Sequence, residues 1–571
     1  MSANDPATNP IVEEADLAWP EHEELYTKGE FSEDYSPVIL EEGKPLSQSI
    51  LWKLQRNFFE GQGIEAWRQG TVPHYITSNP FIANAYAKLV FGFIRDCRSV
   101  TTKSANEVFA PLDLSQPIYI VELGSGSGRF AYHFLKKFLG FYRSSVLKDT
   151  SFKYVMTDFS ERNLEFWRRH QSLQPFVEEA VLDFALFDGE RDEELKLADS
   201  GNVLAPGTVK NPMVVIANYF FDSIPQDAFF FQGGQLQEGL VTVSSYRKEP
   251  DLHDPEIFSR LDISYNRNSV EPDYYKNLDW NEILEYYKKR LDDTAFLFPC
   301  AALQCIDNFR QISGGRLLLV SGDKGYIREE DLLGCGEPEI TRHGSFSMMV
   351  NYHAMGKYVQ KQGGYPLHPP HRHAHLNISA FLLGSHPGDY RETRIAYREA
   401  IENCGPDDFY ALKKAIEHGY ESWTLEQLLA YSRLSGFDAK ITLACYPALM
   451  DRIEHASVSE KQELYRVIQK VWEVYYPLAE DQDVPSHLGV ILYEMGYYAE
   501  ALDLFTRSVE LYGPDATISY SMSLCHYGLK HMDAALECIN EALALDHDLE
   551  EARTMRIKIE ASILAQIIGI H

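Results

Sequence analysis

Gly124, Gly126 and Gly128 alternate with serines in a short segment that joins two regular patterns. Residues 118–123 are a mostly apolar, β-branched run, which predicts a buried strand, and residues 129–139 have the periodicity of an amphipathic helix. Glycines at a strand-to-helix turn let a ligand approach the backbone, and the amino end of the helix favours polar or anionic ligand groups. The segment therefore predicts a ligand-binding turn at the carboxyl edge of a parallel sheet.

Two carboxylates accompany this glycine turn. Glu122 stands before the first glycine, and Asp158 follows the next predicted strand, residues 152–156. An acid at the end of the second strand can accept two hydrogen bonds from ribose hydroxyls. Residues 126–131 also fit the dinucleotide fingerprint, so an NAD-dependent oxidoreductase stays open. However, Glu122 would repel a pyrophosphate, whereas a ligand with an amino acid and a sulfonium tolerates it, which favours S-adenosylmethionine. We therefore expect Glu122 to cradle this ligand together with the three glycines.

Further polar residues follow the apolar segment 213–217. Asn218 and Asp222 stand where polar groups beside a methyl donor would orient the methyl acceptor, and we predict that they are the catalytic residues. Asp183, which follows three apolar residues, is placed like an acid that pairs with the adenine amine. A solvated loop aspartate explains Asp183 equally well.

The stretch Asn-Tyr-Phe-Phe-Asp-Ser-Ile-Pro at residues 218–225 resembles a segment of the MidA-like methyltransferases, the family of the mitochondrial complex I assembly factor. Residues 75–78, 235–241 and 340–346 resemble other segments of that family in the same order. The resemblance covers roughly residues 46–383. It implies an S-adenosylmethionine-dependent enzyme that methylates protein arginine, with Thr77 and Ser78 joining the glycine turn in the cofactor site.

Four positions depart from the family, which has acidic residues where this chain has His74, Pro80, Tyr219 and Ser345. In an arginine methyltransferase, carboxylates hold and polarise the guanidinium, whose pKa is too high for easy deprotonation. The departures leave open a different acceptor. They also leave open a catalytically silent protein that binds the cofactor as a scaffold.

The C-terminal region repeats with a period of about 34 residues, the length of a tetratricopeptide unit. Ala501 aligns with Ala535, Leu502 with Leu536, and Phe505 with Ile539 at that spacing. Small residues at such positions let paired helices approach closely. The region resembles a tetratricopeptide array, with residues 551–568 as its capping helix, and it predicts a surface that selects a protein partner or acceptor.

These patterns divide the chain into four parts. Residues 1–45 are an acidic lead-in that we expect to be disordered. Residues 46–385 are predicted to form an α/β, Rossmann-like methyltransferase domain, with a helical insertion near residues 254–312. A helical connecting region, residues 386–480, then leads to the all-α, tetratricopeptide-like residues 481–571.

The composition restricts the remaining classes of function. Lys and Arg number 53 against 84 Asp and Glu, a net charge of −31, so general nucleic-acid binding is not expected. No apolar run is long enough for a membrane span. The eight cysteines are scattered, which suits reduced core thiols in a cytoplasmic protein. The histidines at residues 368–375 lack an accompanying acid or cysteine, so no metal is predicted, and no pattern indicates an oligomeric state.

Overall fold

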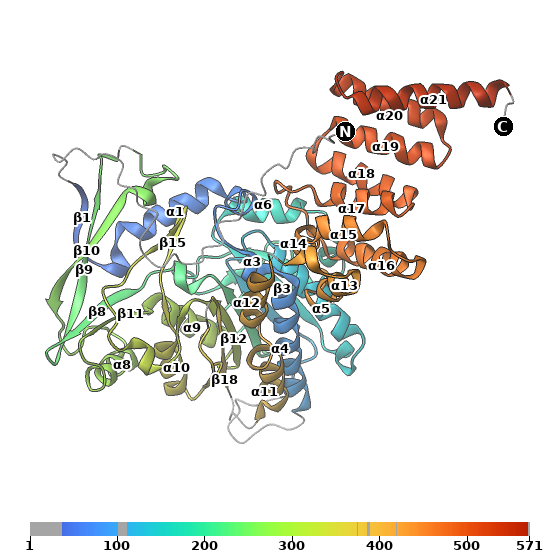
Figure 1. The fold of residues 1–571 in the computed structure, drawn as a ribbon. Coiled ribbons are helices and arrows are strands. Elements are labelled where there is room, and N and C mark those ends of the chain that lie inside the picture. Colours follow the sequence, from blue (N-terminus) through green and yellow to red (C-terminus); the bar gives the residue numbers. More distant parts are fainter. Residues whose placement is uncertain are drawn as a thin grey trace. The chain divides into compact units, whose positions relative to one another are not determined.

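The structure is a computed structural model that describes residues 37–100, 111–249, 251–373, 375–384, 389–417 and 419–568. The chain packs as two compact units (Figure 1). The first unit contains the described residues up to Ser78 together with Ile82–Asp408, and the second contains Asn79–Phe81 and the chain from Phe409 onward. The main division therefore falls at Asp408, and not at residue 385 or residue 480.

A seven-stranded sheet forms the centre of the first unit, in the order β17-β18-β12-β7-β2-β3-β4. Its strands are β2 (Ile118–Leu123), β3 (Phe152–Asp158), β4 (Leu182–Leu186), β7 (Met213–Asn218), β12 (Leu317–Asp323), β17 (Tyr365–Leu367) and β18 (Asn377–Leu383). The five strands from β12 to β4 are parallel, and β18 and β17 continue the sheet antiparallel. Every residue of β2 and β12 is buried, as their continuous apolar runs require.

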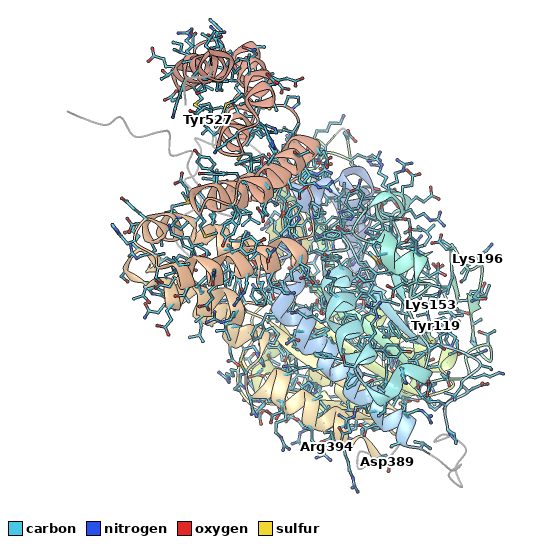
Figure 2. The ribbon with its side chains drawn as sticks, turned by 90° about the vertical axis from the view of Figure 1, so that its right-hand side faces the viewer. Tyr119, Lys153, Lys196, Asp389, Arg394 and Tyr527 are labelled. Carbon is cyan, nitrogen blue, oxygen red and sulfur yellow. The ribbon has the colours of Figure 1, made fainter. Side chains whose placement is uncertain are left out.

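The direction in which the chain crosses the sheet reverses at β2. After β2 the chain forms β3 on one side, and later returns to form β7 on the other side. In open parallel sheets, ligands bind at the carboxyl ends of the strands where this reversal occurs. Tyr119 and Lys153 are register partners near the amino ends of β2 and β3, so their labels in Figure 2 mark the edge opposite to the glycine turn.

Helices cover both faces of this sheet (Figure 1). They are α4 (Pro80–Ser99), α5 (Arg129–Arg143), α6 (Glu161–Arg169), α7 (Gln174–Glu178), α9 (Cys300–Ile312), α10 (Tyr352–Lys361) and α11 (Arg391–Tyr397). On one face, Phe134 and Phe138 of α5 pack against Tyr154 and Phe152 of β3, with ring centroids 5.2 and 4.9 Å apart. On the other face, α9 and α10 share one apolar core with β2, β7 and β12.

A second sheet, antiparallel and five-stranded, stands beside the first. It contains β1 (Val38–Pro45), β8 (Asp227–Gln232), β9 (Gln235–Ser245), β10 (Leu261–Ser269) and β11 (Thr294–Phe298). Helix α1 (Ile50–Gln62) packs against its apolar side, followed by α2 (Glu65–Arg68) and α3 (Tyr75–Ser78). Short strands β14 (Thr341–His343) and β15 (Ser345–Ser347) form a separate hairpin.

Two predictions about this region are wrong. Residues 38–45 form β1, because pairing with β9 satisfies their backbone groups, so the lead-in cannot extend to residue 45. Residues 1–36 lie outside the described part of the chain. The expected helical insertion at 254–312 is mixed: it contains strands β10 and β11 as well as α8 (Leu278–Lys288) and α9. The alternating apolar and aromatic residues of this segment form two strands of the second sheet.

The second unit is helical throughout its described residues. Its helices include α13 (Leu425–Leu434), α14 (Ala439–Ala444), α15 (Tyr446–Ile453), α16 (Val458–Val474), α17 (Val484–Glu494), α18 (Tyr498–Tyr512), α19 (Ala516–Gly528), α20 (Met532–Leu545) and α21 (Glu550–Ile568); α12 (Pro406–Ile416) crosses the division. A β-carbon at Gly489 of α17 would lie 2.8 Å from the ring of Phe505 in α18, so the glycine permits a close helix pair.

Two apolar clusters stabilise this unit. The larger cluster joins α13–α16 to α17 and α18, and it includes Leu464, Leu488 and Phe505. It therefore continues across the boundary expected at residue 480. A smaller cluster, built on Ala535, Ile539 and Ile559, joins α20 to α21. Within the described ranges, no helix is both long and apolar enough to cross a bilayer.

Candidate functional site

The glycine turn lies between β2 and α5, at the point where the sheet reverses direction. Gly124, Gly126 and Gly128 have φ values of +60°, +48° and +79°, a region that residues with a β-carbon disfavour. Gly128 is the residue before α5, so the free backbone N–H groups of that helix begin at the turn. Trp167 of α6 donates a hydrogen bond from Nε1 to the carbonyl oxygen of Gly126 over 2.9 Å. The turn is held in the conformation that its sequence predicts.

Two aromatic side chains border the turn. A β-carbon at Gly126 would lie 2.7 Å from the Trp67 indole, and one at Gly124 would lie 3.1 Å from the Phe220 ring. Trp67 belongs to α2 and Phe220 follows β7, so both reach the turn from distant parts of the chain. Sequence analysis missed Trp67, because no local pattern relates it to the glycines.

Glu122 is turned into the protein. Its Oε2 accepts hydrogen bonds from the Ser125 hydroxyl, at 2.9 Å, and from the Tyr154 hydroxyl, at 3.0 Å. Burial raises the pKa of Glu122 to about 8, so its carboxyl group is mostly protonated at neutral pH. Its contacts stabilise the turn from beneath. The prediction that Glu122 cradles the ligand directly finds no support in this orientation.

Asp158 lies at the carboxyl end of β3, next to the glycine turn. Its two carboxylate oxygens accept hydrogen bonds from the Ser160 amide, at 3.0 Å, and from the Asn163 side chain, at 2.9 Å. Burial raises the pKa of Asp158, while these donors oppose the shift. The backbone amides of Gly126 and Phe159 also act on this carboxylate, so it links the glycine turn to the end of β3.

Asp183 lies away from this edge. It is the second residue of β4, and its buried carboxylate accepts hydrogen bonds from the amides of Phe184, Asp199 and Ser200 at 2.8–3.1 Å. It therefore closes a backbone turn, and the prediction that it pairs with adenine is wrong. The strand continues past Asp183 to Leu186, so the acid that follows its carboxyl end is Asp188.

Asp188 belongs to a small charged cluster at the edge of the site. Arg56 of α1 contacts the Asp188 carboxylate at 2.8 Å, and its guanidinium carbon lies 4.6 Å from the centre of the Phe159 ring. Phe159 directly follows Asp158. Helix α1 thus brings a cation to the two strand ends where a nucleoside base would be expected. Sequence analysis did not identify Arg56 or Asp188.

The segment before α4 lies beside the end of β7. Thr77 and Ser78 are buried in α3, and their hydroxyls donate to the carbonyl oxygen of His74 at 3.1 and 2.7 Å. Asn218 Nδ2 lies 3.5 Å from the Thr77 carbonyl oxygen. The hydroxyls thus stabilise their own turn, while the backbone of the segment contacts Asn218. Arg129 contacts His74 Nε2 at 3.1 Å, and since arginine only donates, this nitrogen is the acceptor.

The end of β7 carries strained and hydrogen-bonded residues. Asn218 Oδ1 accepts a hydrogen bond from the Tyr86 hydroxyl over 2.8 Å. Tyr219, at one of the positions that departs from the MidA-like segment, has a φ of +47°, which a bulky side chain adopts only under strain. Such strain concentrates at functional sites. Asp222 follows in a short helical turn, Phe221–Ser223, and is buried.

Asp323, the last residue of β12, is a second buried acid at this edge. It accepts hydrogen bonds from the Phe220 amide, at 2.9 Å, and from the Tyr352 hydroxyl, at 2.9 Å. Sequence analysis did not single out Asp323. Among the described residues, no group of three or more His, Cys, Asp or Glu side chains is arranged to hold a metal ion.

The fold and this edge define a class of protein: an α/β domain with a glycine turn at its topological reversal, where open parallel sheets bind ligands. Residues 103–321 match the model of a family described as "Putative S-adenosyl-L-methionine-dependent methyltransferase". The match covers less than half of the chain and contains the glycine turn, Asp158, Asn218 and Asp222. This range is a methyltransferase domain, and the predicted cofactor, S-adenosylmethionine, is confirmed.

Other comparisons cover less of the chain or are more distant. A stretch of 64 residues is 36% identical to Intraflagellar transport protein 70A of Danio rerio, and one of 65 residues is 31% identical to that of Xenopus tropicalis. The chain spans about 10% of the length of these curated relatives.

Two solved structures are also similar to parts of the chain. One, from Burkholderia thailandensis, is described as a "likely methyl transferase" bound to S-adenosyl-homocysteine. It covers 57% of this chain and 74% of its own, with 14% identity and a TM-score of 0.34. MamA of Desulfovibrio magneticus RS-1 covers 28% of this chain and 92% of its own, with 17% identity and a TM-score of 0.21.

Proposed function

We propose that the whole protein is an S-adenosylmethionine-dependent methyltransferase that acts on a protein acceptor. The observation that carries the proposal is the glycine turn at the reversal point of the parallel sheet, with Asp158 at the end of the neighbouring strand. This arrangement fits an adenosyl ligand, because its backbone turn suits a polar tail and its carboxylate suits a ribose. In this assignment the domain is Rossmann-like and similar in function to the MidA-like enzymes.

Each part of the site would then have one task. The glycine turn and the amino end of α5 would hold the amino-acid end of the cofactor, and Asp158 would hold the ribose. When bound, S-adenosylmethionine supplies a methyl group on a sulfonium. Asn218 and Asp222 would orient the acceptor at the adjacent strand end, and Trp67 and Phe220 would exclude water. Most of the rate enhancement would come from positioning and from this exclusion.

A basic nitrogen is the acceptor that fits the charges best. Two buried acids, Asp222 and Asp323, remain at the acceptor edge even though four acidic positions of the MidA-like family are absent. Acidic residues also outnumber basic ones in residues 481–571. We propose that this region is a tetratricopeptide-like array that selects a basic protein segment, with arginine as one candidate acceptor.

Calorimetry with S-adenosylmethionine, S-adenosylhomocysteine and NAD tests the cofactor site directly. We expect both adenosyl ligands to bind and NAD not to bind. Asp158→Ala should weaken binding, while Asp262→Ala, at an exposed position of β10, serves as the control. Binding of NAD alone would favour an oxidoreductase and overturn the proposal.

Methyl transfer is measured separately, with methyl-labelled cofactor and basic peptides or a cell extract as acceptors. Label that appears in protein, and that depends on intact Asp158, is the expected result. Cofactor binding without any methyl transfer would instead identify the alternative, a catalytically silent scaffold whose helical region binds a partner. The loss of acids at His74 and Tyr219 is the specific observation that keeps this alternative open.

A further inference from the structure

Two buried carboxyl groups meet at the acceptor edge of the sheet. Asp222 follows β7 and Asp323 ends β12, the parallel neighbour of β7, so the two strand ends bring them together. Each acid also shifts the pKa of the other, as expected for neighbouring carboxyl groups. Asp323 is fully buried, while Asp222 retains 6% of its surface exposed. Asp222 is therefore the member that a small group from outside can reach.

The hydrogen bonds around the pair differ between its members. Asp323 Oδ1 accepts from the Phe220 amide, and its Oδ2 accepts from the hydroxyls of Ser321 and Tyr352 at 3.0 and 2.9 Å. Asp222 Oδ1 accepts only from the neighbouring Ser223 hydroxyl, at 2.8 Å. Asp323 is thus fixed from three sides. This leaves Asp222 as the member whose carboxylate is free to take part in chemistry.

We propose that Asp222 is the general base of the methyl transfer and that Asp323 is a positioning residue, which keeps one proton and donates it as a hydrogen bond to Asp222. Two buried carboxylates in contact cannot both ionise at neutral pH, so one proton stays between them. The inference rests on the proposed function, since it assigns a base to that reaction.

The electrostatics agree with this division of roles. Burial raises the pKa of Asp323 well above its usual range, and the neighbouring Asp222 charge adds to the shift. The hydrogen bonds from Tyr352, Ser321 and the Phe220 amide oppose it without cancelling it. Burial also raises the pKa of Asp222, to about 6, while hydrogen bonds from Ser223 and Asp323, and then the charge of Lys324, oppose the shift. The other titratable groups that face the pair are Tyr86 of α4 and Tyr352 of α10, and burial keeps both phenols neutral.

The proposed step balances as follows. A nitrogen lone pair of the acceptor forms a bond to the methyl carbon, while the carbon–sulfur bond breaks and its electron pair stays on sulfur. The acceptor nitrogen then carries a surplus proton, which passes to the Asp222 carboxylate and from there to solvent. Below the pKa of Asp222 both acids are protonated, so the base is lost as the pH falls.

Infrared spectroscopy tests proton sharing without any turnover. The spectrum of the full-length wild-type protein at pH 7, minus that of Asp323→Asn, should contain the C=O band of one protonated, buried carboxyl group. The protonated Glu122 contributes equally to both spectra and cancels in this difference. Asp307→Asn removes a carboxyl group outside the site and should leave the band unchanged. A wild-type minus Asp323→Asn difference spectrum without this band would overturn the proposal.

The pH dependence of kcat tests the base. In the wild type, kcat should fall about tenfold per pH unit below about 6. Asp323→Asn keeps a hydrogen-bond donor, so its profile should match the wild type. Asp323→Leu has no donor, so its profile should shift to higher pH and its maximal kcat should fall at least about tenfold.

Equal pH profiles in the Asn and Leu variants would overturn the positioning role, and a wild-type profile that is flat between pH 5 and 7 would overturn the base. Circular dichroism and melting curves show whether each variant folds. If Asp323→Leu does not fold, the proposal is tested by the pH dependence of kcat in the wild type and in Asp323→Asn, together with the infrared band. Failure of the proposed function is distinguishable from failure of this inference. In that case the wild type would neither bind S-adenosylmethionine nor transfer a methyl group, while the infrared spectra would still report whether the two acids share a proton.

Discussion

Glu122 illustrates how burial changes the meaning of a motif residue. The acid before the glycine turn suggested a ligand contact, yet its carboxyl group points to Ser125 and Tyr154 and is mostly protonated at neutral pH. A neutral carboxylic acid that receives two hydrogen bonds stabilises the turn without placing a negative charge beneath it. This role depends on pH, and it gives the first prediction at the residue scale.

Glu122→Gln should become progressively more stable than the wild type as the pH rises from 5 to 8. The folded-state pKa of Glu122, about 8, is above its unfolded value, so the native state holds the proton more tightly and wild-type stability falls with rising pH. The difference in unfolding free energy should grow by up to about 1.4 kcal/mol per pH unit. Urea denaturation at three pH values measures it. A difference that does not change with pH would contradict the protonated state.

Asp158→Ala should weaken S-adenosylmethionine and S-adenosylhomocysteine equally, by about 2 kcal/mol, because charge-assisted hydrogen bonds to the ribose are common to both ligands. Calorimetric titration of both ligands measures the loss. If only the methylated ligand binds more weakly, Asp158 contacts the sulfonium end of the cofactor and the ribose assignment is wrong.

At the scale of the element, the glycine turn depends on space as well as on backbone conformation. Gly126→Val should abolish cofactor binding in a folded protein, because a β-carbon there meets Trp67 at 2.7 Å and φ is +48°. Gly314→Val is a matched control, since Gly314 also has a positive φ, +59°, but nothing lies within 4 Å of its β-carbon position. Both variants carry the same backbone strain, so only the first should lose affinity in calorimetry. Equal cofactor affinities in the two variants would show that the glycine turn is not part of the cofactor site.

At the scale of the whole molecule, the helical region is expected to select the acceptor while the first unit holds the cofactor. A cut near Gln482 would separate Leu464 from Leu488 and Phe505, which share one apolar cluster, and would expose that cluster. A cut after Leu529 removes α20 and α21 and leaves the larger cluster complete. The second position therefore separates function from folding more cleanly.

The chain that ends at Leu529 should keep its affinity for S-adenosylmethionine and lose methyl transfer to a protein acceptor. Remote binding energy contributes to positioning, so turnover should fall together with acceptor affinity. Calorimetry and methyl-label transfer measure the two properties on one preparation. Should cofactor affinity disappear as well, the helices support the fold and do not select a partner.

The turn at residues 124–128 could be predicted from the sequence because its signals are local: a β-branched strand, alternating glycines and an amphipathic helix are neighbours in the chain. The close packing of α17 and α18 follows from a local repeat for the same reason. The extent of β4 was not predictable in this way. Since pairing with β3 decides where the strand ends, Asp183 was chosen and Asp188 was missed.

The sequence by itself determined which residues form the glycine turn and which acids flank it, since backbone conformation and periodicity depend on near neighbours. Only the tertiary structure decided where those side chains point. Burial turned Glu122 inward, α2 brought Trp67 to Gly126, and the parallel pairing of β7 with β12 placed Asp323 against Asp222. These contacts join residues far apart in the chain, and their energies come from packing and desolvation, which no local pattern of residues records.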